Sequence, residues 1–119
     1  MAVDAMGGDF GVEVAVAGAL SAARQYGVSL LLVGREGAVR AEVARADVSG
    51  LDIRLIEAPE EVGMAEKVGR PSLKKRSSIL IGIEVAGRGE ADAFFSAGNT
   101  AACWTIAKLT LGTLEEVDR

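Results

Sequence analysis

The sequence contains no histidine, and this absence narrows its chemistry more than any other feature of the composition. Without histidine the chain has no Ser-His-Asp triad, lacks the commonest general base and cannot form most kinds of zinc site. It has a single cysteine, Cys103, so no disulfide can form within the chain. Cys103 lies in an apolar helical pattern, which predicts a small buried thiol rather than a nucleophile. We therefore expect no metal site and no cofactor.

Long hydrophobic runs are also lacking. Residues 30–33 form an uninterrupted apolar run of only four residues, whereas a membrane-spanning helix needs ~20. Asp4 and Asp9 stand near the N-terminus in place of the basic region of a signal peptide. The sequence therefore predicts a soluble, cytoplasmic protein.

Aromatic residues and excess positive charge are scarce as well. The net charge is −4, and one tryptophan, one tyrosine and three phenylalanines are the only aromatics. This composition argues against non-specific nucleic-acid binding. The one basic cluster is Arg70, Lys74, Lys75 and Arg76. It is typical of a solvated helix face, and contact with an anionic ligand or acidic partner is the alternative.

The 119 residues suit one domain in which strands alternate with helices. Apolar runs and period-2 patterns predict strands at residues 2–5, 28–33, 51–55 and 93–95, the third near a sheet edge and the fourth buried. Helical spacing predicts helices at 12–26, 36–46, 74–87 and 101–111, with Asp9 capping the first and an irregular connection over 57–72. The alternation predicts an α/β fold with a three-layer arrangement, a mostly parallel sheet with helices on both faces.

Two turns rich in small residues follow strands of this predicted sheet. Residues 6–9 contain Gly7 and Gly8, and residues 96–100 contain Ser96, Gly98, Asn99 and Thr100. Both turns should lie at the carboxyl edge of the sheet, where backbone N–H groups and a helix N-terminus suit phosphate. Ordinary capping of a strand-to-helix turn is the alternative. Asp4 either caps its own turn or faces a cleft.

Several spaced motifs resemble the PlsX family of bacterial phosphate acyltransferases. They are AVDAMGGDFG at residues 2–11, LVG at 32–34, KKRSS at 74–78, and ADA at 91–93 followed by SAGNT at 96–100. The chain departs from the family at Gly11, where proline is usual, and at Ala101, where glycine is usual. Residues 64–73 also diverge, with Ala65 and Val68 at positions where the family tends to have an acidic residue and proline.

The resemblance implies a Rossmann-like fold, half of an isocitrate/isopropylmalate dehydrogenase-like enzyme, with residues 1–119 as the N-terminal portion of a longer two-part chain. The implied reaction makes acyl phosphate from acyl-acyl carrier protein and inorganic phosphate, for phospholipid synthesis. The resemblance also implies a homo-oligomer, specifically a homodimer, that associates peripherally with the inner membrane face.

The resemblance also implies roles for individual residues. Ser96, Asn99 and Thr100 would hold phosphate, with Gly98, Gly7 and Gly8 beside it and Asp4 orienting the loop or a cationic side chain. Lys75 and Arg76 would meet the anionic substrate or carrier. No general base is evident, so the catalytic groups are expected beyond residue 119 and the chain alone is expected to be inactive.

Three other readings stay open. One is a phosphate acetyltransferase-type enzyme with coenzyme A as the carrier, and another is a phosphate-binding module without catalysis. A flavodoxin-like nucleotide binder is weaker, because no aromatic pair can enclose a flavin and Trp104 is expected to pack in the core. The unfinished sheet further predicts that the chain alone associates.

Overall fold

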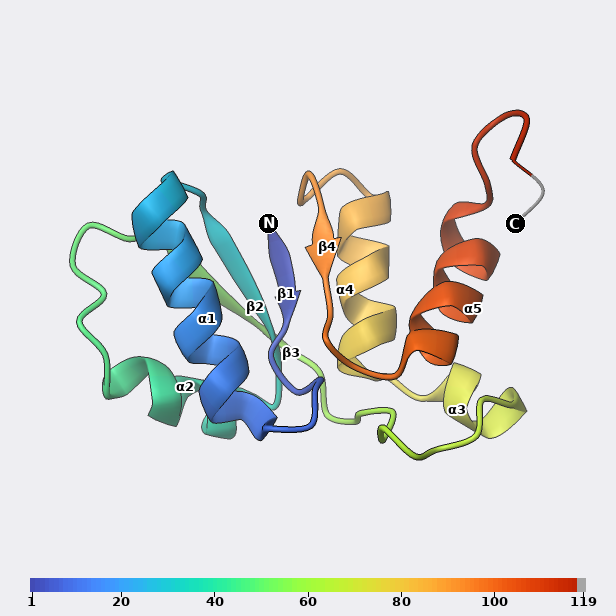
Figure 1. Cartoon of the computed structure of the whole chain (residues 1–119), viewed down its shortest axis with the longest axis horizontal. Helices are drawn as coiled ribbons and strands as arrows, with labels where there is room; N and C mark the ends of the chain where they lie inside the picture. Colours follow the sequence, from blue (N-terminus) through green and yellow to red (C-terminus); the bar gives the residue numbers. More distant parts are fainter. Residues whose placement is uncertain (118–119) are drawn as a thin grey trace.

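Four parallel strands form the centre of the computed structural model, which describes residues 1–117 (Figure 1). They are β1 (Ala2–Asp4), β2 (Leu30–Gly34), β3 (Ile53–Glu57) and β4 (Phe94–Phe95). Their order in the sheet is β3-β2-β1-β4, and every neighbouring pair is parallel. The predicted parallel α/β architecture is confirmed.

Helices connect the strands and cover both faces of the sheet. They are α1 (Gly11–Tyr26), α2 (Glu36–Ala44), α3 (Arg70–Lys74), α4 (Ser78–Gly87) and α5 (Thr100–Leu111). In Figure 1, α1 and α2 lie on one side of the sheet, α4 lies on the other, and α5 packs outside α4.

The alternation of side chains along the strands explains these layers. Val3, Leu30 and Leu32 face α1 and α2 in one buried cluster. Their neighbours Leu31 and Val33 point to the opposite face and pack with α4. Successive side chains of a strand point to opposite faces of its sheet, so continuous apolar strands require helices on both.

The two edge strands were predicted with different success. The strand predicted at residues 51–55 is β3, which lies at one edge and is only partly buried, as expected. The prediction that residues 93–95 form a buried strand is wrong, because β4 pairs only with β1 within the described residues. Phe95 consequently leaves 56% of its surface exposed.

One predicted helix cap and one predicted helix start are also wrong. Asp9 does not cap α1; the residue before the helix is Phe10, which makes no side-chain cap, and Gly11 begins the helix with φ +80°. The helix predicted from residue 74 begins at Ser78, because Ser77 caps it by accepting the N–H of Leu80. Lys75 is extended and lies between α3 and α4. Lys75 and Arg76 therefore lie in a connection rather than on a helix face, whereas Arg70 and Lys74 of the basic cluster are the first and last residues of α3.

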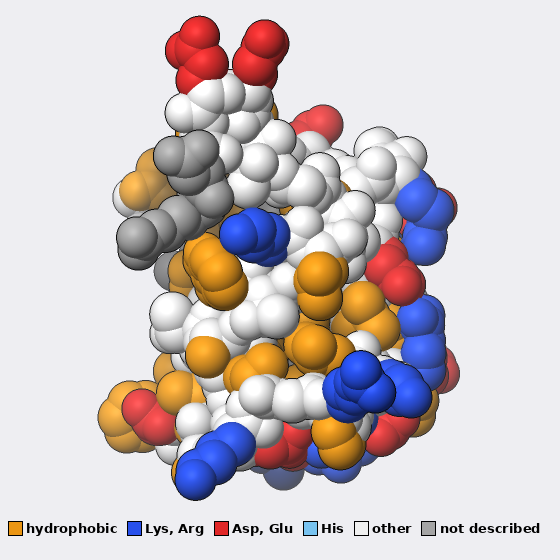
Figure 2. Space-filling model, turned by 90° about the vertical axis from the view of Figure 1, so that its right-hand side faces the viewer, with side chains coloured by type: hydrophobic (Ala, Val, Ile, Leu, Met, Phe, Trp, Pro, Cys, Tyr) orange, Lys and Arg blue, Asp and Glu red, His pale blue; other side chains and the backbone are white. Residues whose placement is uncertain are grey.

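The outer face of α5 carries apolar side chains rather than core contacts. Trp104 is 51% exposed, so the prediction that it packs in the core is wrong, and Lys108 Nζ lies 5.1 Å from its ring centroid. Cys103 is only half-buried. Figure 2 shows hydrophobic side chains gathered on this side of the molecule among lysine and arginine side chains. Association of the chain through such a surface stays a prediction.

Helices that could cross a membrane are absent from the described part of the chain, since none is both long and apolar enough.

Candidate functional site

Asp4 is the buried centre of the candidate site. It ends β1, is 2% exposed, and accepts the backbone N–H groups of Met6 and Gly7 at Oδ1, each at 3.0 Å. Its other oxygen, Oδ2, accepts the Ser96 hydroxyl at 2.7 Å. A buried carboxylate is costly unless its oxygens are hydrogen-bonded, and these three donors meet that need. Asp4 therefore caps its own turn and also links it to the next strand.

Ser96 provides that link from β4. Its hydroxyl oxygen also accepts the N–H of Gly98 at 3.0 Å, which fixes the course of the chain after the strand. Because β1 and β4 are parallel neighbours, their carboxyl ends lie at the same edge of the sheet. The structure brings the two predicted turns together, as expected.

Glycine allows the two turns to approach this closely. A Cβ at Gly7 would overlap Oδ2 of Asp4 and lie 2.9 Å from the backbone nitrogen of Gly98. Gly8 has φ +111°, a conformation that side chains other than glycine rarely adopt. Glycine is therefore required at residues 7 and 8 because the two turns pack closely together and the backbone at Gly8 has a positive φ.

Asn99 is buried, at 6% exposure, and its side-chain amide has three partners in the chain. The oxygen Oδ1 accepts the N–H of Ala102 at 3.1 Å and caps α5. The nitrogen Nδ2 donates to the carbonyl oxygens of Gly63 and Glu66, at 3.0 and 2.8 Å. Asn99 thus holds the connection between β3 and α3 against the start of α5.

Thr100 is the predicted phosphate residue that faces solvent. It is the first residue of α5 and is exposed. The first N–H groups of a helix have no intrahelical partner, and the Asn99 side chain satisfies only that of Ala102. The hydroxyl and N–H of Thr100 and the N–H of Ala101 are the groups that this turn offers to an anion.

The predicted anion-contacting cations lie in ion pairs with acidic side chains. Lys75 Nζ lies 2.7 Å from Glu66 Oε1 and also donates to the carbonyl of Glu61 at 3.2 Å. Arg76 Nη1 lies 3.2 Å from Glu84 Oε2. Lys75 thereby fixes the same loop that Asn99 holds. Contact of Lys75 and Arg76 with an anionic partner stays a prediction.

The pKa of Glu66 is predicted to depend on Lys75. The hydrogen bond from Lys75 lowers the pKa of the Glu66 carboxyl, with a smaller contribution from the N–H of Gly63. We expect Lys75→Gln to raise this pKa towards its ordinary value, measured by NMR titration of the carboxyl group. A lowered folded-state pKa stabilises the fold above the unfolded-state pKa, and this stabilisation is lost as the pH falls through the folded-state pKa. An unchanged Glu66 pKa in Lys75→Gln, or an equal shift in the control Lys67→Gln, would contradict the assignment.

Cys103 lies close enough to this site for Asp4 to affect its thiol. Partial burial raises the pKa of the Cys103 thiol, a hydrogen bond with Ser96 lowers it by less, and the Asp4 carboxylate adds to the rise. The thiol is therefore held in its neutral, weakly nucleophilic form. The helical pattern around Cys103 predicts a thiol that is not a nucleophile, but it does not predict that this thiol lies near Asp4.

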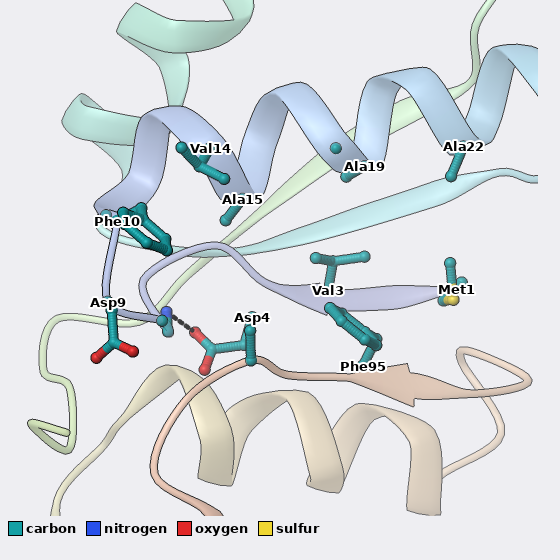
Figure 3. Close-up of a pocket in the computed structure, with 15 residues that line it drawn as sticks. Met1, Val3, Asp4, Asp9, Phe10, Val14, Ala15, Ala19, Ala22 and Phe95 are labelled. Carbon is teal, nitrogen blue, oxygen red and sulfur yellow. Dashed lines mark hydrogen bonds between the residues drawn. The ribbon is translucent and has the colours of Figure 1, made fainter.

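A cavity of about 510 Å³ opens beside the Gly7-Gly8 turn (Figure 3). One wall is α1, and the other is formed by Val3 of β1 and Phe95 of β4. Asp4 and Asp9 lie at one end of the cavity and Met1 at the other. This cavity was not predicted, although the alanines and glycine on the less buried side of α1 are a signal for it in the sequence.

Groups of three or more histidine, cysteine or acidic side chains that could hold a metal ion are not found among residues 1–117.

Comparison with known proteins relates the whole chain to one family. The sequence model of a family described as "Fatty acid synthesis protein" matches residues 1–119. The chain is 42% identical over 118 residues to a phosphate acyltransferase of Herpetosiphon aurantiacus, covering 98% of this chain and 32% of the relative. It is 45% identical over 120 residues to a phosphate acyltransferase of Citrifermentans bemidjiense, covering 100% of this chain and 34% of the relative. The chain thus spans about a third of the length of these curated relatives.

Proposed function

Because the chain belongs to the fatty acid synthesis protein family, we propose that it forms the phosphate-holding part of a phosphate acyltransferase in phospholipid synthesis. The donor in this proposal is an acyl-acyl carrier protein and the acceptor is inorganic phosphate. The enzyme acts as a homo-oligomer in the cytoplasm, where it associates peripherally with the membrane. Residues 1–119 form its N-terminal portion.

The proposed reaction is an acyl transfer in which phosphate itself is the nucleophile. A phosphate oxygen attacks the thioester carbonyl, the carbon–sulfur bond breaks, and the carrier leaves as its thiolate while acyl phosphate is released. Such a reaction needs phosphate fixed beside the carbonyl and donors for the developing oxyanion. In this proposal, the two turns meet the first requirement.

One observation carries the proposal, namely the pair of turns joined by the Asp4–Ser96 hydrogen bond. Both turns end parallel strands at the edge where ligands of open α/β sheets bind. The N-terminus of α5 follows the second turn, and its free N–H groups suit an anion.

The side chains of the two turns have distinct roles in this proposal. Thr100 contacts phosphate through its hydroxyl and N–H groups, while Gly7, Gly8 and Gly98 let the anion approach the backbone. The remaining predicted site residues, Asp4, Ser96 and Asn99, use their side chains inside the protein. They position the turns that receive phosphate.

Calorimetric titration of the chain with inorganic phosphate tests this proposal. We expect Thr100→Val to weaken phosphate binding at least about tenfold, since it removes a hydrogen bond to a charged group worth roughly 1.5–3 kcal/mol. The control is Thr110→Val, which makes the same change at an exposed position near the other end of α5. Equal affinities in the two variants, or no binding by the unaltered chain, would contradict the proposed site. With a full-length family member, faster formation of acyl phosphate from acyl-coenzyme A than from acyl-acyl carrier protein would contradict the proposed donor.

A further inference from the structure

The apolar cavity between α1 and the edge strand β4 is a groove that leads to the joined turns. It follows α1 from Gly11 to Ala22, a length of about 16 Å at 1.5 Å per residue. Its volume of about 510 Å³ lies within the roughly 300–1,000 Å³ of small-molecule sites. An apolar site of this length suits a linear hydrocarbon.

The joined turns give the groove a direction. Asp4 and Asp9, its only charged lining side chains within the described residues, lie together at one end (Figure 3). That end is also bounded by Gly7, Gly8 and Ala97, which belong to the two joined turns. A ligand filling the groove therefore has an apolar part along α1 and its polar end beside the turns.

We propose that this groove holds the hydrocarbon chain of the acyl group, with the acyl carbonyl at the turns; the inference rests on the proposed function. Acyl phosphate joins a hydrocarbon chain directly to a phosphate group. The structure offers an apolar groove that ends at the turns assigned to phosphate. The side chains across the groove, Val3 and Phe95, contact the hydrocarbon and keep water from it.

Gly18 sets the room available in the groove. It lies on the groove side of α1, and a Cβ built there would meet no atom within 4 Å. A larger side chain at residue 18 therefore enters the groove without a clash in the protein. Gly37 offers a matched control, since it is an exposed glycine in α2, away from the groove, and its Cβ would also meet nothing within 4 Å.

The test measures binding of three kinds of probe to the 119-residue chain by NMR. The probes are linear alcohols from butanol to octanol, inorganic phosphate, and octyl phosphate. We expect each additional buried methylene to tighten alcohol binding about fourfold, with signal changes in α1 and β4. Octyl phosphate should bind more tightly than either octanol or phosphate. Gly18→Leu should weaken octanol binding at least tenfold and leave phosphate binding unchanged, whereas Gly37→Leu should change neither.

The probes separate the groove from the phosphate site. If phosphate binds but the alcohols do not, or if octyl phosphate binds no more tightly than octanol, the groove inference is overturned and the proposed function stands. If the alcohols bind but phosphate does not, the phosphate site fails while the groove stands as a hydrocarbon site. Equal octanol affinities in Gly18→Leu and Gly37→Leu would overturn the inference. The inference would also be overturned if the alcohols do not bind and the chain self-associates in a way that Gly18→Leu abolishes. A second copy of the chain would then occupy the groove.

Discussion

Replacing Asp4 by alanine is expected to destabilise the protein by about 3–4 kcal/mol, because the three donors left without an acceptor are partly buried and each costs roughly 1 kcal/mol, the low end of the penalty for an unpaired buried group. The substitution removes the acceptor of the Met6 and Gly7 N–H groups and of the Ser96 hydroxyl. A domain has only about 5–15 kcal/mol of stability, so the loss should be plain in urea unfolding followed by circular dichroism. Phosphate binding should fall as well, because the two turns lose the bond that joins them.

Asp4→Asn is the matched control for this substitution. The amide oxygen can still accept the N–H groups of Met6 and Gly7, while the amide nitrogen faces the Ser96 hydroxyl, which can rotate to accept it. We expect a loss of no more than about 1.5 kcal/mol, the net value of one hydrogen bond. Equal destabilisation by the two substitutions would show that the negative charge, rather than the hydrogen bonds, stabilises the turns. A loss below 1 kcal/mol for Asp4→Ala would contradict the central role of Asp4.

The meeting of the two turns could be predicted because it follows from parallel topology. Asp4 and Ser96 are 92 residues apart, but Asp4 ends β1 and Ser96 directly follows β4, and neighbouring parallel strands end at the same edge. The contacts of the Asp4 side chain could not be predicted, since the sequence was compatible both with capping of its own turn and with a position facing a cleft. The hydrogen bond depends on the order β1-β4 in the sheet, which local pattern does not contain.

The errors have a shared physical origin in how the elements pack. Phe95 and Trp104 are large apolar residues in apolar segments, so they were placed inside, but β4 is an edge and α5 packs outside α4. Exposure at these positions depends on how many neighbouring elements the chain itself supplies. The start of α4, in contrast, had a local signal, because Ser77 is a strong N-cap residue directly before Ser78. The helix was nevertheless predicted to begin at residue 74, because the basic residues before Ser77 are typical of a solvated helix face.

The role of Asn99 illustrates a contact that sequence cannot supply. Capping of α5 follows from its residue type and position. Its donation to Gly63 and Glu66 joins it to a connection more than 30 residues earlier, and nothing in the irregular composition of that connection fixes its course. The structure therefore gives Asn99 two functions, only one of which was open to prediction.

Asn99→Ala is expected to lower the free energy of unfolding by about 2–4 kcal/mol, because it removes one buried and two partly buried hydrogen bonds worth roughly 1 kcal/mol each. The Ala102 N–H and the carbonyls of Gly63 and Glu66 lose their side-chain partner. Amide hydrogen exchange should therefore accelerate both at the start of α5 and in residues 63–66. Loss of phosphate binding in this variant would not by itself identify Asn99 as a ligand, since both segments are loosened.

Asn99→Asp separates the two functions. Its carboxylate can still accept the N–H of Ala102 and favourably meets the positive end of α5, but it cannot donate to the carbonyls of Gly63 and Glu66. We expect the start of α5 to keep its protection against exchange while residues 63–66 exchange faster. If phosphate contacts only Thr100 and the helix N–H groups, the added negative charge should also weaken phosphate binding without loosening α5. Fast exchange at Ala102 in Asn99→Asp, or unchanged exchange in residues 63–66, would contradict this division of roles.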